Sequence, residues 1–249
     1  MDVDWVGSYC GSPPVPALLA ARWMFDPLLW GAVALLAAWL VHRQHERQRQ
    51  LATATSAALF VLAFASPLCA AGVALFSARS VHHLWIFVMC APLLAFGWPT
   101  TARMPRPGVA AALFALVIWA WHVPVIYDGT LRAPWLYWLM QLLLLAAATY
   151  WWRAMRAPAP LGERLLALGA TALQMGVLGA LLSFSTRPWF DSHLATSAAF
   201  GLSALDDQRL GGVVMWVLGM LPVGIAMAWI ARGFASASAS NMPGAGRLP

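Results

Sequence analysis

The feature that most constrains this 249-residue chain is a series of long runs without Asp, Glu, Arg or His. A helix of about 20 apolar residues crosses a hydrocarbon core of about 30 Å, and most of these runs are long enough to do so. Uninterrupted runs cover residues 50–78, 133–152, 165–186 and 210–231. Runs 80–102 and 107–127 contain only histidines as interruptions, and a shorter apolar run covers 24–41. The pattern predicts an all-α membrane protein, a bundle of about seven transmembrane helices.

Composition supports this class of fold. The chain is 61% hydrophobic and 10% charged, which excludes an ordinary soluble domain. Asp2 and Asp4 stand where a secretory signal peptide would carry basic residues, so we expect no signal peptide. The three cysteines, Cys10, Cys69 and Cys90, form no CxxC pair, and their spacing predicts no disulfide framework.

All 15 basic residues are arginines, and their positions predict the topology. One set of alternate loops holds ten: Arg43, Arg47, Arg49, Arg103, Arg106, Arg153, Arg156, Arg164, Arg232 and Arg247. The other set holds five: Arg22, Arg79, Arg132, Arg187 and Arg209. The positive-inside rule places the first set in the cytoplasm, with the N-terminus outside and the C-terminus inside. The net charge of +6 follows from this excess of arginines on the cytoplasmic side. We therefore expect the lipid bilayer as a partner, and we do not expect nucleic acid.

The same pattern divides the chain into three parts. We expect residues 1–22 to form an outer N-terminal segment and residues 23–232 to form the seven-helix transmembrane domain. Residues 233–249 (GFASASASNMPGAGRLP) are small, polar and rich in Gly and Pro, which predicts a disordered cytoplasmic tail.

Four of the six histidines fall near one depth on the predicted outer side: His82, His83, His122 and His193. Imidazole is costly to place in a membrane, so intramembrane histidines point to a functional site. Pro124 is expected to end the helix that carries His122.

Helical periodicity gives each histidine of the adjacent pair its own face. His82 shares a face with Met89, and His83 shares one with Cys90, each two turns away or roughly 10 Å along the helix. This spacing suits a relay of two binding positions along the helix. It also suits one metal site at the outer side with a softer sulfur ligand deeper in the helix. Imidazole with thioether or thiolate is the ligand set that copper prefers. The alternative is structural, with Cys90 a small buried hydrophobe and the methionines Met175, Met220 and Met227 packing in the core.

The segment before the last run reads SALDDQRLGGVVMW. Ser203 and Asp206 match a capping box, which leaves Asp207 and Gln208 unexplained. Gly211 and Gly212 are expected to permit close approach of another helix, with Met215 near the depth of the histidines. The stretch PLCAAGVALFSARS is expected to form a small helix at the membrane interface. No catalytic motif is present, so we predict that the protein is not an enzyme.

Three blocks in this order resemble the multi-span CtaG family of cytochrome c oxidase assembly factors. They are FASPLCAAGVALFSARSVHHLWIFVMCAPLLAFGWP, WHVPVIYDGTLR and SALDDQRLGGVVMW, and the resemblance covers nearly the whole chain. The resemblance implies a multi-pass protein of the bacterial inner membrane that assists maturation of the copper centres of haem–copper oxidases. It implies cytochrome c oxidase subunits as partners, together with a periplasmic copper chaperone.

The resemblance also implies a set of site residues. The family's recurrent polar positions correspond here to His83, His122, Asp128, Asp207, Gln208 and Met215. Where members often carry a His-Met pair, this chain has Arg79 and Ser80. Together with the periodicity, these positions predict a transient copper site at His83, His122, Met215, His82, Cys90 and Asp207. Two alternatives stay open: haem ligation by His83 and His122, and a zinc hydrolase that uses the outer histidines with an aspartate.

Overall fold

Helices make up 80% of the chain in the computed structural model, which describes residues 8–98 and 106–240, with side chains to residue 233. No strand occurs in those residues, so the all-α prediction is confirmed. The elements are α1 (Pro16–Leu19), α2 (Pro27–His42), α3 (Arg47–Ala65), α4 (Pro67–Ala74), α5 (Phe76–Trp85), the π-helix η2 (Ile86–Cys90), α6 (Ala91–Gly97), α7 (Pro107–Trp121), α8 (Pro124–Arg132), α9 (Pro134–Arg156), α10 (Leu161–Ser183), the 3-10 helices η3 (Asp191–His193) and η4 (Ser197–Phe200), and α11 (Ala204–Ser240).

Proline sets many of the helix starts. Helices α2, α4, α7, α8 and α9 each begin with Pro as the first residue, where the missing N–H costs no hydrogen bond. Asp26 caps α2, because its Oδ1 accepts hydrogen bonds from Leu28 N at 2.9 Å and Leu29 N at 3.2 Å. Ser203 caps α11 as expected, since Asp206 N donates to Ser203 Oγ at 3.1 Å, and the Asp206 carboxylate accepts from the same hydroxyl.

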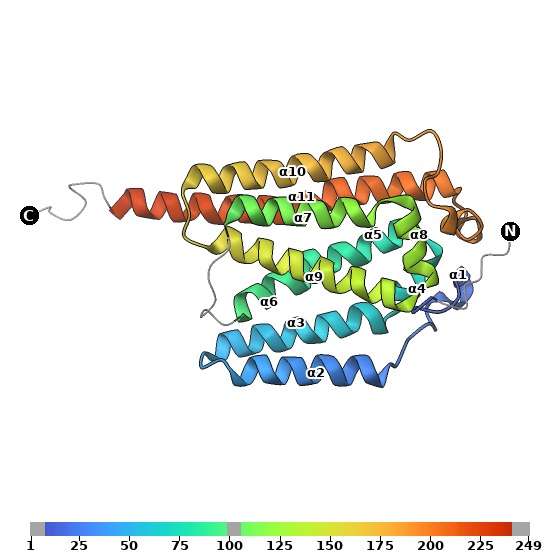
Figure 1. The fold of residues 1–249 in the computed structure, drawn as a ribbon, viewed down its shortest axis with the longest axis horizontal. Helices are drawn as coiled ribbons and strands as arrows, with labels where there is room; N and C mark the ends of the chain where they lie inside the picture. The colour runs from blue at the N-terminus through green and yellow to red at the C-terminus, as the bar shows by residue number, and fades with distance from the viewer. Residues whose placement is uncertain (1–7, 99–105, 241–249) are drawn as a thin grey trace, which may run out of the picture.

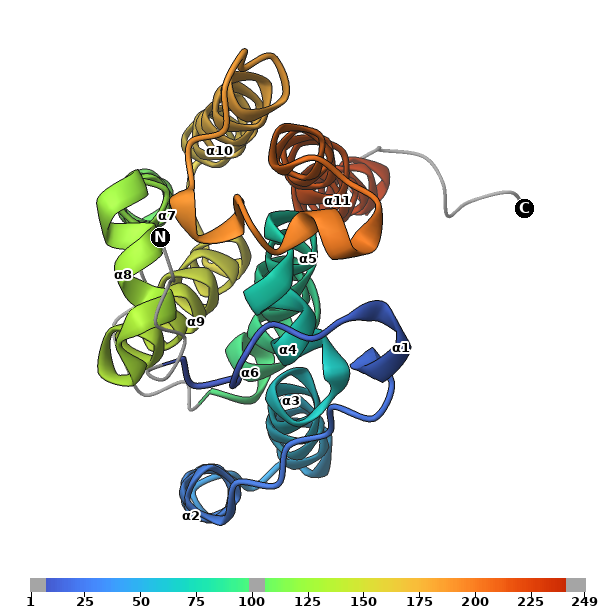
Figure 2. The same ribbon diagram turned by 90° about the vertical axis from the view of Figure 1, so that its right-hand side faces the viewer.

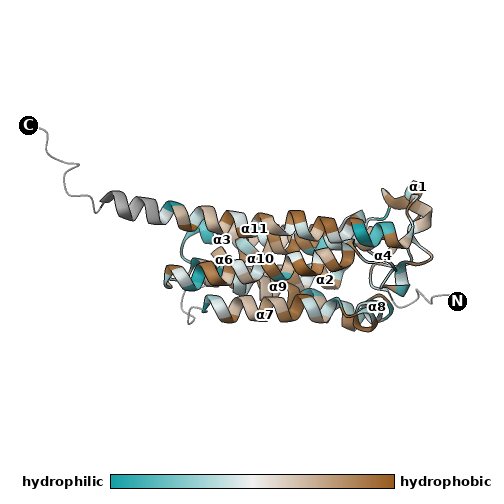
Figure 3. Ribbon diagram, turned by 90° about the horizontal axis from the view of Figure 1, so that it is seen from above, coloured by the Kyte–Doolittle hydropathy of each residue, from teal (hydrophilic) through white to brown (hydrophobic). Residues whose placement is uncertain are grey.

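The long helices lie side by side, and the continuous segment α5–η2–α6 lies between α3, α9 and α11 (Figures 1 and 2). We call the end that carries α4, α8 and residues 184–203 the histidine end, at the right of Figure 1. The opposite end, where α2 meets α3 and α9 meets α10, is the arginine end. The helices are apolar over most of their length (Figure 3), and many of their large apolar side chains are exposed, as expected for contact with lipid.

The predicted runs coincide with helices, but fewer helices have the length and composition of a membrane span. Among the described residues, the segments 76–97, 161–183 and 204–233 qualify. Two more spans are obtained if the pair α3–α4, bent by 50°, and the pair α7–α8, bent by 71°, each count as one. Helix α2 is apolar but shorter. The structure thus supports three to five spans, and seven spans and the orientation of the termini stay predictions.

Close approach of α11 to its neighbours depends on the predicted glycines. A Cβ at Gly212 would lie 2.8 Å from the carbonyl oxygen of Gly179 in α10, and one at Gly211 would collide with the Phe76 ring in α5. Both positions therefore exclude any larger side chain, which confirms the role expected for this glycine pair.

The expectation of no disulfide is wrong. Cys10 and Cys69 form a disulfide with Cα atoms 5.6 Å apart, although 59 residues separate them. Sequence spacing gave no sign of this because the N-terminal segment folds back over the buried short helix α4. The Tyr137 hydroxyl lies 3.3 Å from Cys10 Sγ and 3.5 Å from Cys69 Sγ.

At the C-terminus, α11 continues to Ser240, beyond the boundary at residue 233 expected for the tail. Residues 241–249 lie outside the described residues. The predicted disorder of the tail and the three-part division of the chain stay predictions.

Candidate functional site

Three predicted ligands from three helices line one small cavity near the histidine end. His83 comes from α5, His122 from the residue after α7, and Met215 from α11. The cavity has a volume of about 30 Å³, and its other walls are mostly apolar. The tertiary structure therefore brings together side chains that are up to 132 residues apart in the sequence.

His122 is held in one tautomer by the end of α7. Its Nδ1 lies 2.7 Å from the carbonyl oxygen of Ile118, which accepts only, so Nδ1 carries the proton. In the neutral ring, Nε2 then keeps its lone pair. A backbone carbonyl that fixes the second nitrogen in this way is typical of metal-binding histidines. The bend before Pro124, predicted from the sequence, places the ring at the helix end.

His83 presents a nitrogen without a partner. Its Nε2 is shielded from solvent and has no hydrogen bond within the described residues. The side chain is half-buried, and it lines the same cavity as His122. A buried polar atom without a partner is costly, so a ligand or water at this nitrogen would be favourable.

Met175 of α10 lines the same cavity, which the sequence did not indicate. It is 2% exposed and also packs in the core, as expected for it. Gly219 leaves room for its methyl group, since a Cβ there would lie 2.7 Å from Met175 Cε. Only the packing of α10 against α11 shows that this methionine faces the histidines. Two thioethers and two imidazoles therefore surround the cavity.

His82 and Cys90 do not line this cavity. His82 faces a separate cavity of about 10 Å³ beside the disulfide and packs edge-on against Phe64, with ring centroids 4.8 Å apart. Cys90 is fully buried, and its carbonyl accepts a hydrogen bond from Ser56 Oγ of α3 at 2.8 Å. The expected faces assumed a uniform α-helix, and the π-helix η2 changes the angular spacing beyond Trp85. Met89, the expected partner of His82, is 42% exposed on the outside.

Asp207, another of the predicted ligands, accepts hydrogen bonds at the start of α5. Its Oδ2 accepts from Phe76 N at 2.6 Å, and its Oδ1 accepts from Ser77 N at 3.1 Å and from Ser77 Oγ. The carboxylate thus caps the first turn of α5 from the neighbouring helix, and it does not line the histidine cavity. Gln208 joins α11 to α10 and to the loop after it. Its Oε1 accepts from Trp189 N, and its Nε2 donates to the Leu182 carbonyl.

Asp128 organises the segment that closes the histidine end. Its two oxygens accept from Asp191 N at 3.2 Å and Ser192 N at 3.1 Å. The neighbouring Tyr127 hydroxyl lies 2.7 Å from His193 Nε2. Burial, followed by the charge of Arg79, lowers the pKa of His193 to about 3, so this histidine is neutral near pH 7.

Arg79 was expected in a loop, but it is a buried residue of the bundle. It is 3% exposed, donates to Thr130 Oγ1 at 2.5 Å, and lies over the Tyr127 ring with Cζ 4.8 Å from the centroid. The hydrogen bond and the aromatic face compensate part of the cost of burying this charge, while Nε has no hydrogen-bond partner among the described residues. The sequence did not indicate this buried position, because a single arginine between two apolar stretches is typical of a loop.

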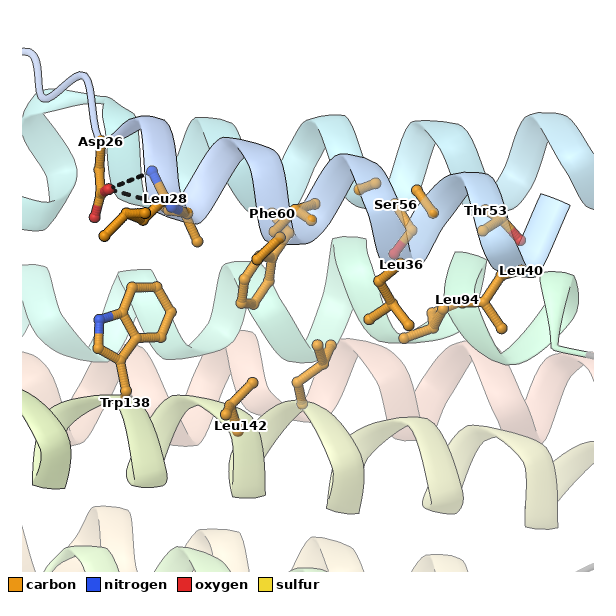
Figure 4. A pocket seen from close by; sticks show the side chains of 16 residues that line it. Asp26, Leu28, Leu36, Leu40, Thr53, Ser56, Phe60, Leu94, Trp138 and Leu142 are labelled. Carbon is orange, nitrogen blue, oxygen red and sulfur yellow. Dashed lines mark hydrogen bonds between the residues drawn. The ribbon is translucent and has the colours of Figure 1, made fainter.

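A much larger cavity lies away from the histidines. It is a groove of about 430 Å³ between α2, α3, α6 and α9 (Figure 4). Leucines and alanines of α2 line it along the length of that helix, and the carboxylate of Asp26 at one end is occupied by capping. Apolar side chains without convergent polar groups give this groove no chemistry, so the small cavity is the better candidate site.

Within the described part of the chain, no three His, Cys, Asp or Glu side chains are grouped so that they could hold a metal ion. Any metal in the small cavity would therefore depend on thioether ligands as well as imidazoles. This ligand set fits a soft ion such as Cu(I) and does not fit a hard cation.

A family model described as cytochrome c oxidase caa3 assembly factor matches residues 29–237. Comparison with curated proteins gives no match, and comparison with solved structures gives none. The match extends from α2 into α11 and includes every residue of the small cavity. The chain therefore belongs to the cytochrome c oxidase caa3 assembly factor family.

Proposed function

We propose that this assembly factor holds one Cu(I) ion transiently in the small cavity and passes it to a copper centre of its client oxidase. The observation that carries the proposal is the convergence of His83, His122 and Met215, with Met175 beside them, on one cavity. Copper here is cargo, so a site with few ligands suits it better than a closed cage. The client subunits and a periplasmic copper chaperone are the partners that this function requires.

The two alternative functions receive less support from the geometry. A cavity of about 30 Å³ has the volume of one water molecule, far below the size of a haem macrocycle. A zinc hydrolase would need an aspartate free to activate water beside the outer histidines. The oxygens of Asp207 and Asp128 instead accept backbone hydrogen bonds. The family description names assembly and no reaction, and we infer that the protein is not an enzyme.

The test is Cu(I) binding by purified protein in competition with a chromophoric chelator. We expect one bound ion, and we expect His83→Ala and His122→Ala each to weaken binding at least tenfold, because each removes an imidazole from the cavity. Met215→Leu, which keeps the volume, should weaken binding less. In cells, the same histidine variants should lower cytochrome c oxidase activity under limiting copper while haem synthesis stays normal.

Matched controls are present in the same chain. His82→Ala removes a buried histidine that does not line the cavity, and Met89→Leu removes an exposed thioether. Both should bind copper as the unchanged protein does. Equal copper binding in the His83, His122 and control variants would overturn the copper proposal. Normal oxidase activity in a deletion strain under limiting copper would instead count against the assembly role of this member.

A further inference from the structure

Arginine side chains gather around one aromatic residue at the arginine end. Phe96, in the last turn of α6, contacts two guanidinium groups, with Arg49 Cζ 5.5 Å and Arg156 Cζ 4.8 Å from the ring centroid. Arg49 Nη1 also donates to the Phe96 carbonyl at 3.3 Å. Arg153 lies over the next aromatic ring, with Cζ 5.6 Å from the Trp98 centroid. Three cationic groups from α3 and α9 thus surround the end of α6.

This cluster has little negative charge to balance it. The ion pairs found among the described residues join Arg49 to Glu46 and Arg209 to Asp206, and neither includes Arg153 or Arg156. Burial, followed by the positive charges of Arg49 and Arg153, lowers the pKa of Arg156. The C-terminal dipole of α9, about half a charge, offsets only part of the repulsion. An anion between the guanidinium groups would relieve the rest.

An apolar groove begins at the same residues. It has a volume of about 380 Å³ between α6, α9 and α11, and Phe96 and Arg156 belong both to the groove and to the cluster. Its remaining walls are mainly Trp152, Met155, Ile225, Ala226 and Trp229. One turn of a helix with its side chains fills about 400 Å³, so the groove is too small for another transmembrane helix. A single hydrocarbon chain suits this volume and lining.

We propose that the arginine end binds one anionic phospholipid. The phosphate lies among Arg49, Arg153 and Arg156, and one acyl chain lies in the groove between α6, α9 and α11. Guanidinium groups bind phosphate through paired, charge-assisted hydrogen bonds, and basic pockets between membrane helices are suited to such headgroups. The proposal is independent of the copper proposal, because the two sites lie at opposite ends of the bundle.

The test is a lipid titration followed by native mass spectrometry of the full chain in an uncharged detergent. Phosphatidylglycerol should bind at least tenfold more tightly than phosphatidylcholine. The double variant Arg153→Gln/Arg156→Gln should lose this preference. Arg43→Gln/Arg47→Gln, which removes the same charge at the same end but outside the cluster, should retain it. Ile225→Trp, which adds bulk at an exposed wall of the groove and leaves the arginines, should weaken phosphatidylglycerol binding at least fivefold.

Each outcome decides for or against the site. Equal binding of the two lipids, or an unchanged preference in the Arg153/Arg156 variant, overturns the proposal. Displacement of phosphatidylglycerol by inorganic phosphate at the lipid's own apparent affinity would show a phosphate site without a lipid groove, and also overturns it. Thermal unfolding checks the fold of each variant. If the double arginine variant does not fold, the Ile225→Trp result decides.

Discussion

At the scale of single residues, the carboxylate of Asp207 holds the start of α5. Asp207→Ala leaves the Phe76 and Ser77 amides buried without acceptors, and we expect a loss of about 1–3 kcal/mol in unfolding free energy. Asp207→Asn keeps an acceptor oxygen and should lose less. Copper binding should persist in the Asn variant. Thermal unfolding and copper titration measure the two effects.

The matched control is Asp206→Ala, whose exposed carboxylate accepts from Ser203 Oγ and forms an exposed ion pair with Arg209. We expect this substitution to lower the unfolding free energy by less than about 0.5 kcal/mol, as most surface substitutions do. Loss of copper affinity in Asp207→Asn without a change in stability would show that the carboxylate is a ligand and that the capping role is secondary.

At the scale of elements, the disulfide ties the N-terminal segment to α4. Iodoacetamide labelling of unfolded, unreduced protein should modify Cys90 and leave Cys10 and Cys69 unmodified. Cys10→Ser should lower the unfolding free energy by about 2–4 kcal/mol, the usual contribution of a disulfide. Cys90→Ser is the control, because Cys90 has no disulfide partner and its loss leaves the bond intact. Labelling of all three cysteines in the unreduced protein would contradict the disulfide.

At the scale of the whole molecule, the arginine distribution and the disulfide favour the same orientation. Disulfides persist in oxidising compartments, so Cys10–Cys69 favours an outward-facing histidine end. We expect a reporter that works only in the cytoplasm to be active when it is fused after Arg232. A reporter that needs the periplasm, fused at the same position, is the paired control and should be inactive. Activity of the periplasmic reporter would reverse the topology and place the histidines inside.

Much of the fold could be predicted from the sequence because lipid imposes simple rules. Charge-free runs indicated the helices, Pro124 indicated the break after His122, and the glycine pair at 211–212 indicated close packing of α11. Burial of backbone polar groups in a membrane requires helices, and proline and glycine act locally. These features depend on neighbours along the chain, so one sequence suffices to find them.

The sequence by itself determined the helical class, the bend at His122 and a candidate ligand set that included His83, His122 and Met215. Only the tertiary structure decided which candidates meet: Met175 joins them, while the π-helix leaves Cys90 out of the cavity. Disulfide pairing and the burial of Arg79 were decided in the same way. The physical reason is that helical periodicity fixes a residue's angle on its own helix, whereas the rotation of each helix against its neighbours depends on packing across the whole bundle.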